Sequence, residues 1–147
     1  MHSMSDRYDL DRFLRAQEPV LPQVERELGE GRKRSHWMWF IFPQLRGLGR
    51  SEMAWRYGIA GAAEARAYLA HPLLGPRLRH WTALVLAVPA RSAREIFGSP
   101  DDLKFHSSMT LFAAVAPEEA LFRDALARFH GAAPDAATLA RLRDAVG

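Results

Sequence analysis

Apolar residues recur at helical spacing along most of the chain. Leu10, Phe13 and Leu14 share one face of a predicted helix over 9–17, for which Asp9 is a suitable N-terminal cap. Spacing, capping residues and helix propensity predict further helices over 20–28, 61–71, 72–88, 99–112, 117–131 and 135–146. Ser92 and Glu95 fit a capping box for a short turn between two of them. Alternating strand patterns are scarce, so we predict a mainly α fold.

The segment 36–42 does not follow this pattern. Read as a strand, it has an apolar residue at every position of both faces from Trp37 to Phe42, and read as a helix it is apolar all round. Periodicity cannot choose between the two in so short a run. We favour a short buried helix ending at Pro43, with a short strand-like segment as the alternative.

Length and composition indicate one globular unit. The 147 residues contain no repeat or linker, so we predict a single domain over 1–147, with 1–7 as a loose tail. There is no cysteine, which excludes disulfides and thiolate metal sites and suits the cytoplasm. No apolar run is long enough for a membrane span, and the N-terminus lacks a signal-peptide pattern. The oligomeric state stays open.

Positive charge is concentrated in one stretch. The net charge is +3, but five basic residues and no acid lie between Gly31 and Arg50. Such a field favours an anionic, phosphate-bearing partner, although a solvated positive face is the plainer alternative. The basic residues are Arg32, Lys33, Arg34, Arg46 and Arg50.

The end of this stretch, "PQLRGLGRS", combines glycines with a helix start. Gly47 and Gly49 allow close backbone approach, and Ser51 is a suitable cap for the helix that follows. A glycine turn before a helix N-terminus can bind an anion through main-chain N–H groups, helped here by Arg46 and Arg50. The alternative is an ordinary loop that reverses the chain.

A second polar group occurs in "DDLKFHSSMTLF". Lys104 and Ser108 are four residues apart and so share a helix face, with Ser107 beside them. These side chains suit the lining of a cleft, and less readily a serine nucleophile with its base. His36, between the basic run and Trp37, is a further candidate acid or base. The six histidines show no metal-binding spacing, so we predict no metal and no cofactor.

Several stretches resemble a known family. "GRKRSHWMWFIFPQLRGLGRS", "HPLLGPRL", "EIFGSPDDLKFHSSMTLFAAVAP" and "FHGAAPDAATLARL" look like the bacterial domain-of-unknown-function family 1810, in the family's order from about Asp9 to Leu142. The resemblance implies a small, mostly helical, cytoplasmic single-domain protein and brings no established reaction. "MTLFAAVAPEEALFRDALARFHG" and "LGPRLRHW" are also similar to helices of the NADAR proteins, which act on ADP-ribose and related compounds. The G-x-N-x-L-G stretch of that family is missing after Gly131.

These observations lead to one main functional hypothesis. We expect a pocket for a phosphorylated nucleotide or ADP-ribose-type ligand, with hydrolysis of an N-glycosidic bond as the accompanying reaction. The alternatives are a nucleic-acid-binding module with exposed tryptophans, and a non-catalytic partner-binding protein. The enzyme hypothesis requires Lys104, Ser107, Ser108, Gln44 and His36 to meet in one cavity. The expected phosphate ligands are Arg32, Lys33, Arg34 and Lys104, and the expected stacking residues are Trp37 and Trp39.

Overall fold

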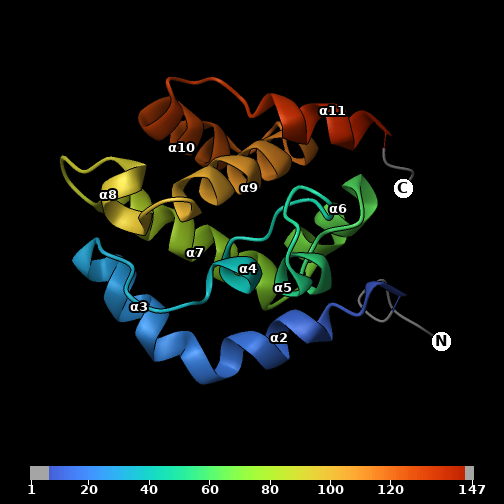
Figure 1. Ribbon diagram of the computed structural model, residues 1–147, viewed down its shortest axis with the longest axis horizontal. Helices are drawn as coiled ribbons and strands as arrows, with labels where there is room; N and C mark the ends of the chain where they lie inside the picture. Colours follow the sequence, from blue (N-terminus) through green and yellow to red (C-terminus); the bar gives the residue numbers. More distant parts are fainter. Residues whose placement is uncertain (1–6, 145–147) are drawn as a thin grey trace.

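The computed structural model describes residues 7–144, which fold into a bundle of helices (Figure 1). The predicted mainly α fold is therefore confirmed. The predicted loose tail over 1–7 lies, apart from Arg7, outside the described residues. The helices are α2 (Asp11–Gln17), the 3-10 helix η1 (Glu18–Val20), α3 (Leu21–Glu30), α4 (Met38–Ile41), α5 (Glu52–Arg56), α6 (Ala62–Ala70), α7 (Leu74–Ala87), α8 (Ala93–Phe97), α9 (Asp101–Val115), α10 (Ala120–His130) and α11 (Ala136–Asp144).

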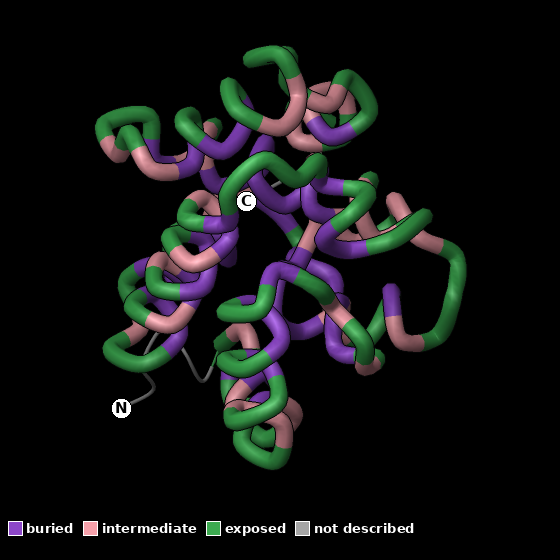
Figure 2. The backbone as a smooth tube through the Cα atoms, turned by 90° about the vertical axis from the view of Figure 1, so that its left-hand side faces the viewer, coloured by how far each residue is buried: buried purple, intermediate pink, exposed green. Residues whose placement is uncertain are grey.

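Helix α9 lies at the centre of the packing. It contacts α6, α8, α10 and α11, while α7 contacts α3, α6 and α10. Figure 1 shows α2 and α3 on one side of the molecule and α10 and α11 on the opposite side, with α4 and α7 between them. From Ser107 to Phe112 every residue of α9 is buried, as expected for a helix covered on several faces. Figure 2 shows that buried segments of the chain face the interior and exposed ones the outside.

The segment 36–42 contains the short helix α4, so the strand-like alternative is wrong. Trp37 is fully buried and Phe42 is 1% exposed, which agrees with the predicted burial of this segment. A strand at 36–42 would have to pair with another segment of the backbone. The isolated parallel bridge found within 7–144 joins Leu45 and Ile59, which lie outside this segment.

Most predicted helix ends correspond to a cap, with two corrections. Gly31 ends α3 in the left-handed conformation at φ 75°, and Ser92 and Glu95 form the predicted capping box. Asp9, however, does not cap α2, which begins at Asp11 without a side-chain cap. Ser99, the first residue of the helix predicted over 99–112, does not cap α9 either, because Pro100 holds the N-cap position without a side-chain hydrogen bond.

No helix among the described residues is long and apolar enough to span a membrane.

Candidate functional site

The basic loop 32–37 is wrapped around one buried carboxylate. Glu27 in α3 is 3% exposed. Its Oε1 accepts hydrogen bonds from the main-chain N–H groups of Arg34 at 2.7 Å and Ser35 at 3.0 Å, and from the indole N–H of Trp37 at 3.0 Å. Its Oε2 accepts from the Ser35 hydroxyl at 2.6 Å. The loop is therefore held from inside by the side chain of a preceding helix.

These hydrogen bonds also decide the charge of Glu27. Burial raises the pKa of its carboxyl, but hydrogen bonds from the Ser35 hydroxyl, the two amides and the Trp37 indole outweigh burial and hold the pKa below its usual value. Glu27 is thus an anion at neutral pH. The main-chain N–H of Lys33 donates to the carbonyl of Ile96 at 2.7 Å, which ties the loop to α8 and fixes where the Lys33 side chain begins.

Two lysines far apart in the sequence meet at one aspartate. Lys33 Nζ lies 2.8 Å from Asp101 Oδ2, and Lys104 Nζ lies 3.4 Å from Asp101 Oδ1. Each ammonium also lies over an indole, Lys33 at 5.1 Å from the Trp37 ring centre and Lys104 at 5.1 Å from that of Trp39. We call these five residues the lysine cluster.

The members of the lysine cluster differ in how far a ligand can reach them. The Lys33 side chain is 7% exposed, whereas those of Asp101 and Lys104 are 19% and 24% exposed. Trp37 is fully buried and donates to Glu27, so it lies in the core, while Trp39 is partly exposed. The accessible part of the cluster is therefore Lys104, Asp101 and Trp39.

The two predicted serines of α9 have different surroundings. The Ser107 hydroxyl donates to the Leu103 carbonyl at 3.1 Å and lies 3.4 Å from Asp135 Oδ2, so it faces the start of α11. Ser108 is one helical turn from Lys104 and fully buried, and its hydroxyl has no hydrogen-bond partner among the described residues. Ser108 therefore shares a helix face with Lys104 of the lysine cluster, at a spacing of four residues.

The remaining predicted residues near this loop lie at the surface. The side chains of Arg32, Arg34 and His36 are exposed. The main-chain N–H of Arg34 donates to Glu27, so this residue helps to hold the loop through its backbone, independently of its side-chain charge.

The second predicted stretch, 43–51, is held by a helix from the other end of the chain. Arg141 of α11 donates from Nε to the Arg46 carbonyl at 2.7 Å. Its guanidinium lies directly against Gly47, where a Cβ would fall 1.9 Å from Nη2, and Gly47 has φ 98°. Gly47 is therefore needed for its backbone conformation and for the space that Arg141 occupies.

The anion pocket expected at the helix N-terminus after this stretch stays a prediction. Ser51 caps α5, as predicted, because its hydroxyl accepts from Ala54 N–H at 3.0 Å. However, α5 has only five residues, and Arg50 is exposed. Gly49 packs closely, since a Cβ there would lie 2.7 Å from Ala54 Cβ and 3.3 Å from the Gln44 side-chain nitrogen. Gln44 thus belongs to this loop.

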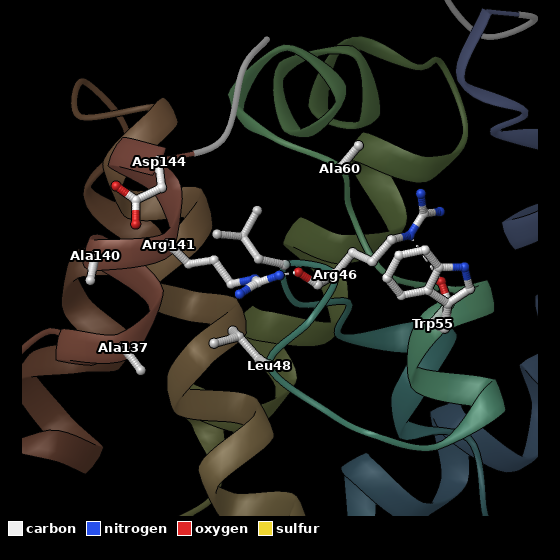
Figure 3. A pocket seen from close by; sticks show the side chains of 9 residues that line it. Arg46, Leu48, Trp55, Ala60, Ala137, Ala140, Arg141 and Asp144 are labelled. Atoms are coloured by element: carbon white, nitrogen blue, oxygen red, sulfur yellow. Dashed lines mark hydrogen bonds between the residues drawn. The ribbon is translucent and has the colours of Figure 1, made fainter.

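A cleft of about 620 Å³ opens between this stretch and α11 (Figure 3). We call it the α11 cleft. The guanidinium of Arg46 lies 4.8 Å from the ring centre of Trp55, which is 61% exposed. Figure 3 shows Arg141 reaching from α11 towards the main chain at Arg46. The cleft is lined by Leu45, Arg46, Leu48, Trp55, Ala60, Ala137, Ala140, Arg141 and Asp144.

The candidate catalytic residues do not share a cleft among those described within 7–144. Besides the α11 cleft, one of about 360 Å³ lies beside Gly31 and Val88, and one of about 260 Å³ lies beside Leu69 and Ala116. None of these three is lined by His36, Gln44, Lys104, Ser107 or Ser108. The convergence that the enzyme hypothesis requires is not seen in them.

A stacked histidine pair lies where α9, α10 and α11 meet. The His106 and His130 rings are 4.0 Å apart, and His106 Nε2 lies 2.7 Å from the Ala133 carbonyl. Burial and the nearby His106 lower the pKa of His130 to about 4, against the opposing charges of Asp102 and Asp135. Within 7–144 no group of three or more histidines and carboxylates could hold a metal ion.

Sequence reasoning missed three residues that organise these sites. Glu27 had a signal, because an acid on the same helix face as Val24 and Leu28 requires buried partners. Asp101 gave no separate signal, because an acid in the first turn of a helix is already favoured by the helix dipole. Arg141 had no signal, since its contact is with a residue 95 positions away.

Comparison with known proteins gives the family. A family described as "Protein of unknown function (DUF1810)" matches residues 7–142. The chain belongs to this family. The resemblance seen in the sequence is therefore confirmed, and it brings no assigned reaction with it.

A solved relative in the same comparison supports the fold. The chain is 55% identical to a conserved hypothetical protein of Mycobacterium tuberculosis, Rv1873, whose crystal structure is known. The match covers 93% of this chain and 98% of that chain, with a TM-score of 0.92. No curated protein matches this member of the DUF1810 family.

Proposed function

We propose that the lysine cluster binds a phosphate-bearing small molecule of the nucleotide or ADP-ribose type. The observation that carries this proposal is that two ammonium groups share a single carboxylate, Asp101. The group therefore keeps a net positive charge of about one, in a partly buried setting where it attracts an anion more strongly than in bulk water.

The surroundings of the cluster suit the two parts of such a ligand. The exposed guanidinium groups of Arg32 and Arg34 belong to the loop that carries Lys33 and add to the positive field. Trp39 is partly exposed beside Lys104 and offers an aromatic surface for a base. Ser108 adds a buried hydroxyl whose hydrogen bonding is unsatisfied among the described residues.

The proposal is for binding rather than catalysis. A serine nucleophile needs a base within hydrogen-bond reach, whereas Ser107 donates to a main-chain carbonyl and His36 lies exposed. Hydrolysis of an N-glycosidic bond is therefore tested separately, by looking for free base in the mixtures used to measure binding. The nucleic-acid alternative required two exposed indoles, and the burial of Trp37 argues against it.

Calorimetry with ADP-ribose at low salt tests the proposal. We expect binding by the wild type, weaker binding of AMP, and none of adenosine, which lacks phosphate. Lys104→Ala is expected to weaken ADP-ribose binding about tenfold, because a charge-assisted contact is lost. The matched control is Arg26→Ala, an exposed cation of α3 outside the cluster, which is expected to change affinity less than about twofold.

Thermal unfolding of both variants shows whether the fold is intact, and Lys104→Gln provides a second, milder substitution. Absence of heat with the wild type at millimolar ADP-ribose would sink the proposal. Equal losses in the Lys104 and Arg26 variants would show a diffuse charge effect instead of a site. Chromatography of the same mixtures detects any free base released by hydrolysis.

A further inference from the structure

The α11 cleft is independent of the lysine cluster and has its own chemistry. Its volume of about 620 Å³ lies within the range of roughly 300–1,000 Å³ typical of small-molecule pockets. The α11 side consists of Ala137, Ala140, Arg141 and Asp144, which share one helix face at spacings of three and four residues. The two alanines leave the space, and the charged residues supply polar contacts at one side of it.

The two arginines of the cleft are held in place by neutral groups. Arg141 Nε donates to the Arg46 carbonyl at 2.7 Å, and Arg46 Nε donates to the Trp55 carbonyl at 3.1 Å. Among the ion pairs of the described residues, none joins either guanidinium to a carboxylate. A neutral carbonyl thus orients each guanidinium, and neither forms an ion pair within the described residues, so terminal N–H groups are left for a ligand.

Fixed guanidinium groups are suited to one kind of partner. Their planar forks match the two oxygens of a carboxylate or a phosphate, and preorganisation reduces the entropy lost on binding. Trp55 contributes a largely exposed indole, and Leu48 and the alanines an apolar wall, which suit a flat ring. Two arginines against Asp144 give a net charge of about +1, which favours one anionic group over a polyphosphate.

We infer that the α11 cleft binds a small planar molecule that carries a single oxyanion group. The oxyanion lies against the terminal N–H groups of Arg141, and the ring lies along Leu48 and extends towards Trp55. This site shares no residue with the lysine cluster, so its occupancy does not depend on the function proposed above.

Nuclear magnetic resonance titration with matched naphthalene probes tests this inference. The probes are 2-naphthoate, 2-naphthyl phosphate, uncharged 2-naphthamide, and inorganic phosphate, which has no ring. We expect the two naphthyl anions to shift the Trp55 indole N–H signal, assigned with Trp55→Phe, and the amide and inorganic phosphate to bind at least about tenfold more weakly. The stronger of the two anions identifies carboxylate or phosphate as the preferred group.

Variants localise the binding. Arg141→Ala is expected to weaken 2-naphthoate about tenfold, whereas Arg143→Ala, an exposed arginine of α11 outside the cleft lining, is expected to change it less than about twofold. Ala137→Leu keeps both charges and fills the cleft, so it is expected to block binding even if Arg141→Ala perturbs the loop. Lys104→Ala is expected to leave 2-naphthoate binding unchanged.

Equal affinity for 2-naphthoate and 2-naphthamide would overturn the inference. Equal losses in the Arg141 and Arg143 variants, or no shift of the Trp55 signal at millimolar probe, would do the same. Loss of 2-naphthoate binding in Lys104→Ala would place the probe at the lysine cluster and would also overturn it. ADP-ribose binding is measured separately, so failure at one site is distinguishable from failure at the other.

Discussion

The loops 32–37 and 43–51 both carry basic residues and no acid, yet they are held in opposite ways. In the first, Glu27 accepts four hydrogen bonds and Lys33 reaches Asp101, so buried carboxylates organise the positive segment. In the second, Arg141 donates to a main-chain carbonyl and fills the space above Gly47. The first loop is centred on a buried anion of the protein, while the second is held by a cation from the other end of the chain.

The largest effect is expected from Glu27→Gln. All partners of this carboxylate are donors, so an amide group would place N–H against N–H and leave buried groups unpaired. We expect the free energy of unfolding to fall by about 3 kcal/mol, measured by denaturant titration. Glu30→Gln, at an exposed position of the same helix, should stay within about 0.5 kcal/mol. Equal effects would mean that Glu27 does not organise the loop.

A pair of glycine substitutions tests the second loop. Gly47→Ala introduces a Cβ at φ 98° and against Arg141, so we expect a loss of about 2 kcal/mol in unfolding free energy. Gly29→Ala lies in α3 with no atom within 4 Å of the added Cβ, and we expect a gain of about 0.5 kcal/mol. The test is whether the two substitutions change the unfolding free energy in opposite directions, measured by denaturant titration. If Gly47→Ala leaves it unchanged, Arg141 can move away from the added Cβ without loss of stability.

Lowering the pH should reduce the free energy of unfolding through His130, at the end of α10. The pKa of His130 falls from 6.5 to about 4 on folding, so the unfolded state binds more protons between these values and stability decreases as the pH falls through them. Because this side chain is only partly buried, we expect a loss of about 1–2 kcal/mol from about pH 7 to about pH 5, measured by denaturant titration. His130→Gln should remove most of this slope. A variant that keeps the slope would assign it to other groups.

The smallest expected difference in stability is between two substitutions in the second loop, at Ser51 and Arg50. Ser51→Ala removes the cap of α5, for which we expect a loss of about 1 kcal/mol in unfolding free energy. Arg50→Ala changes an exposed side chain and should stay within about 0.5 kcal/mol. Thermal unfolding of the two variants in parallel checks the order. An effect of Arg50 larger than that of Ser51 would indicate a contact of Arg50 that supports the loop.

The helices were predictable because burial on one face leaves a periodic pattern in the sequence. The failures occurred at helix starts such as Asp9 and Ser99, where a suitable residue type was present and the backbone placed the helix a residue or two further on. Trp37 was correctly expected to be buried, since it was apolar under either periodicity, but its full burial leaves Trp39 as the expected stacking residue that a ligand can reach.

The sites were less predictable because they depend on contacts between distant positions. Lys33, Lys104 and Trp39 were named from residue type alone, and the structure brings them together. Their shared counter-ion, Asp101, was not foreseen because a helix start already explained it. The α11 cleft could not be predicted at all, since alanines that leave space resemble alanines that fill a helix.

The contacts of the two loops also differ in how early they can form during synthesis. Glu27 bonds to residues only 7 to 10 positions later, whereas Arg141 bonds to a residue 95 positions earlier. Closing the shorter segment costs less chain entropy, so the first loop can order together with α3 as soon as Trp37 has left the ribosome. The contact of Arg141 with the second loop must wait for nearly the whole chain, so the two loops become ordered at different stages of synthesis.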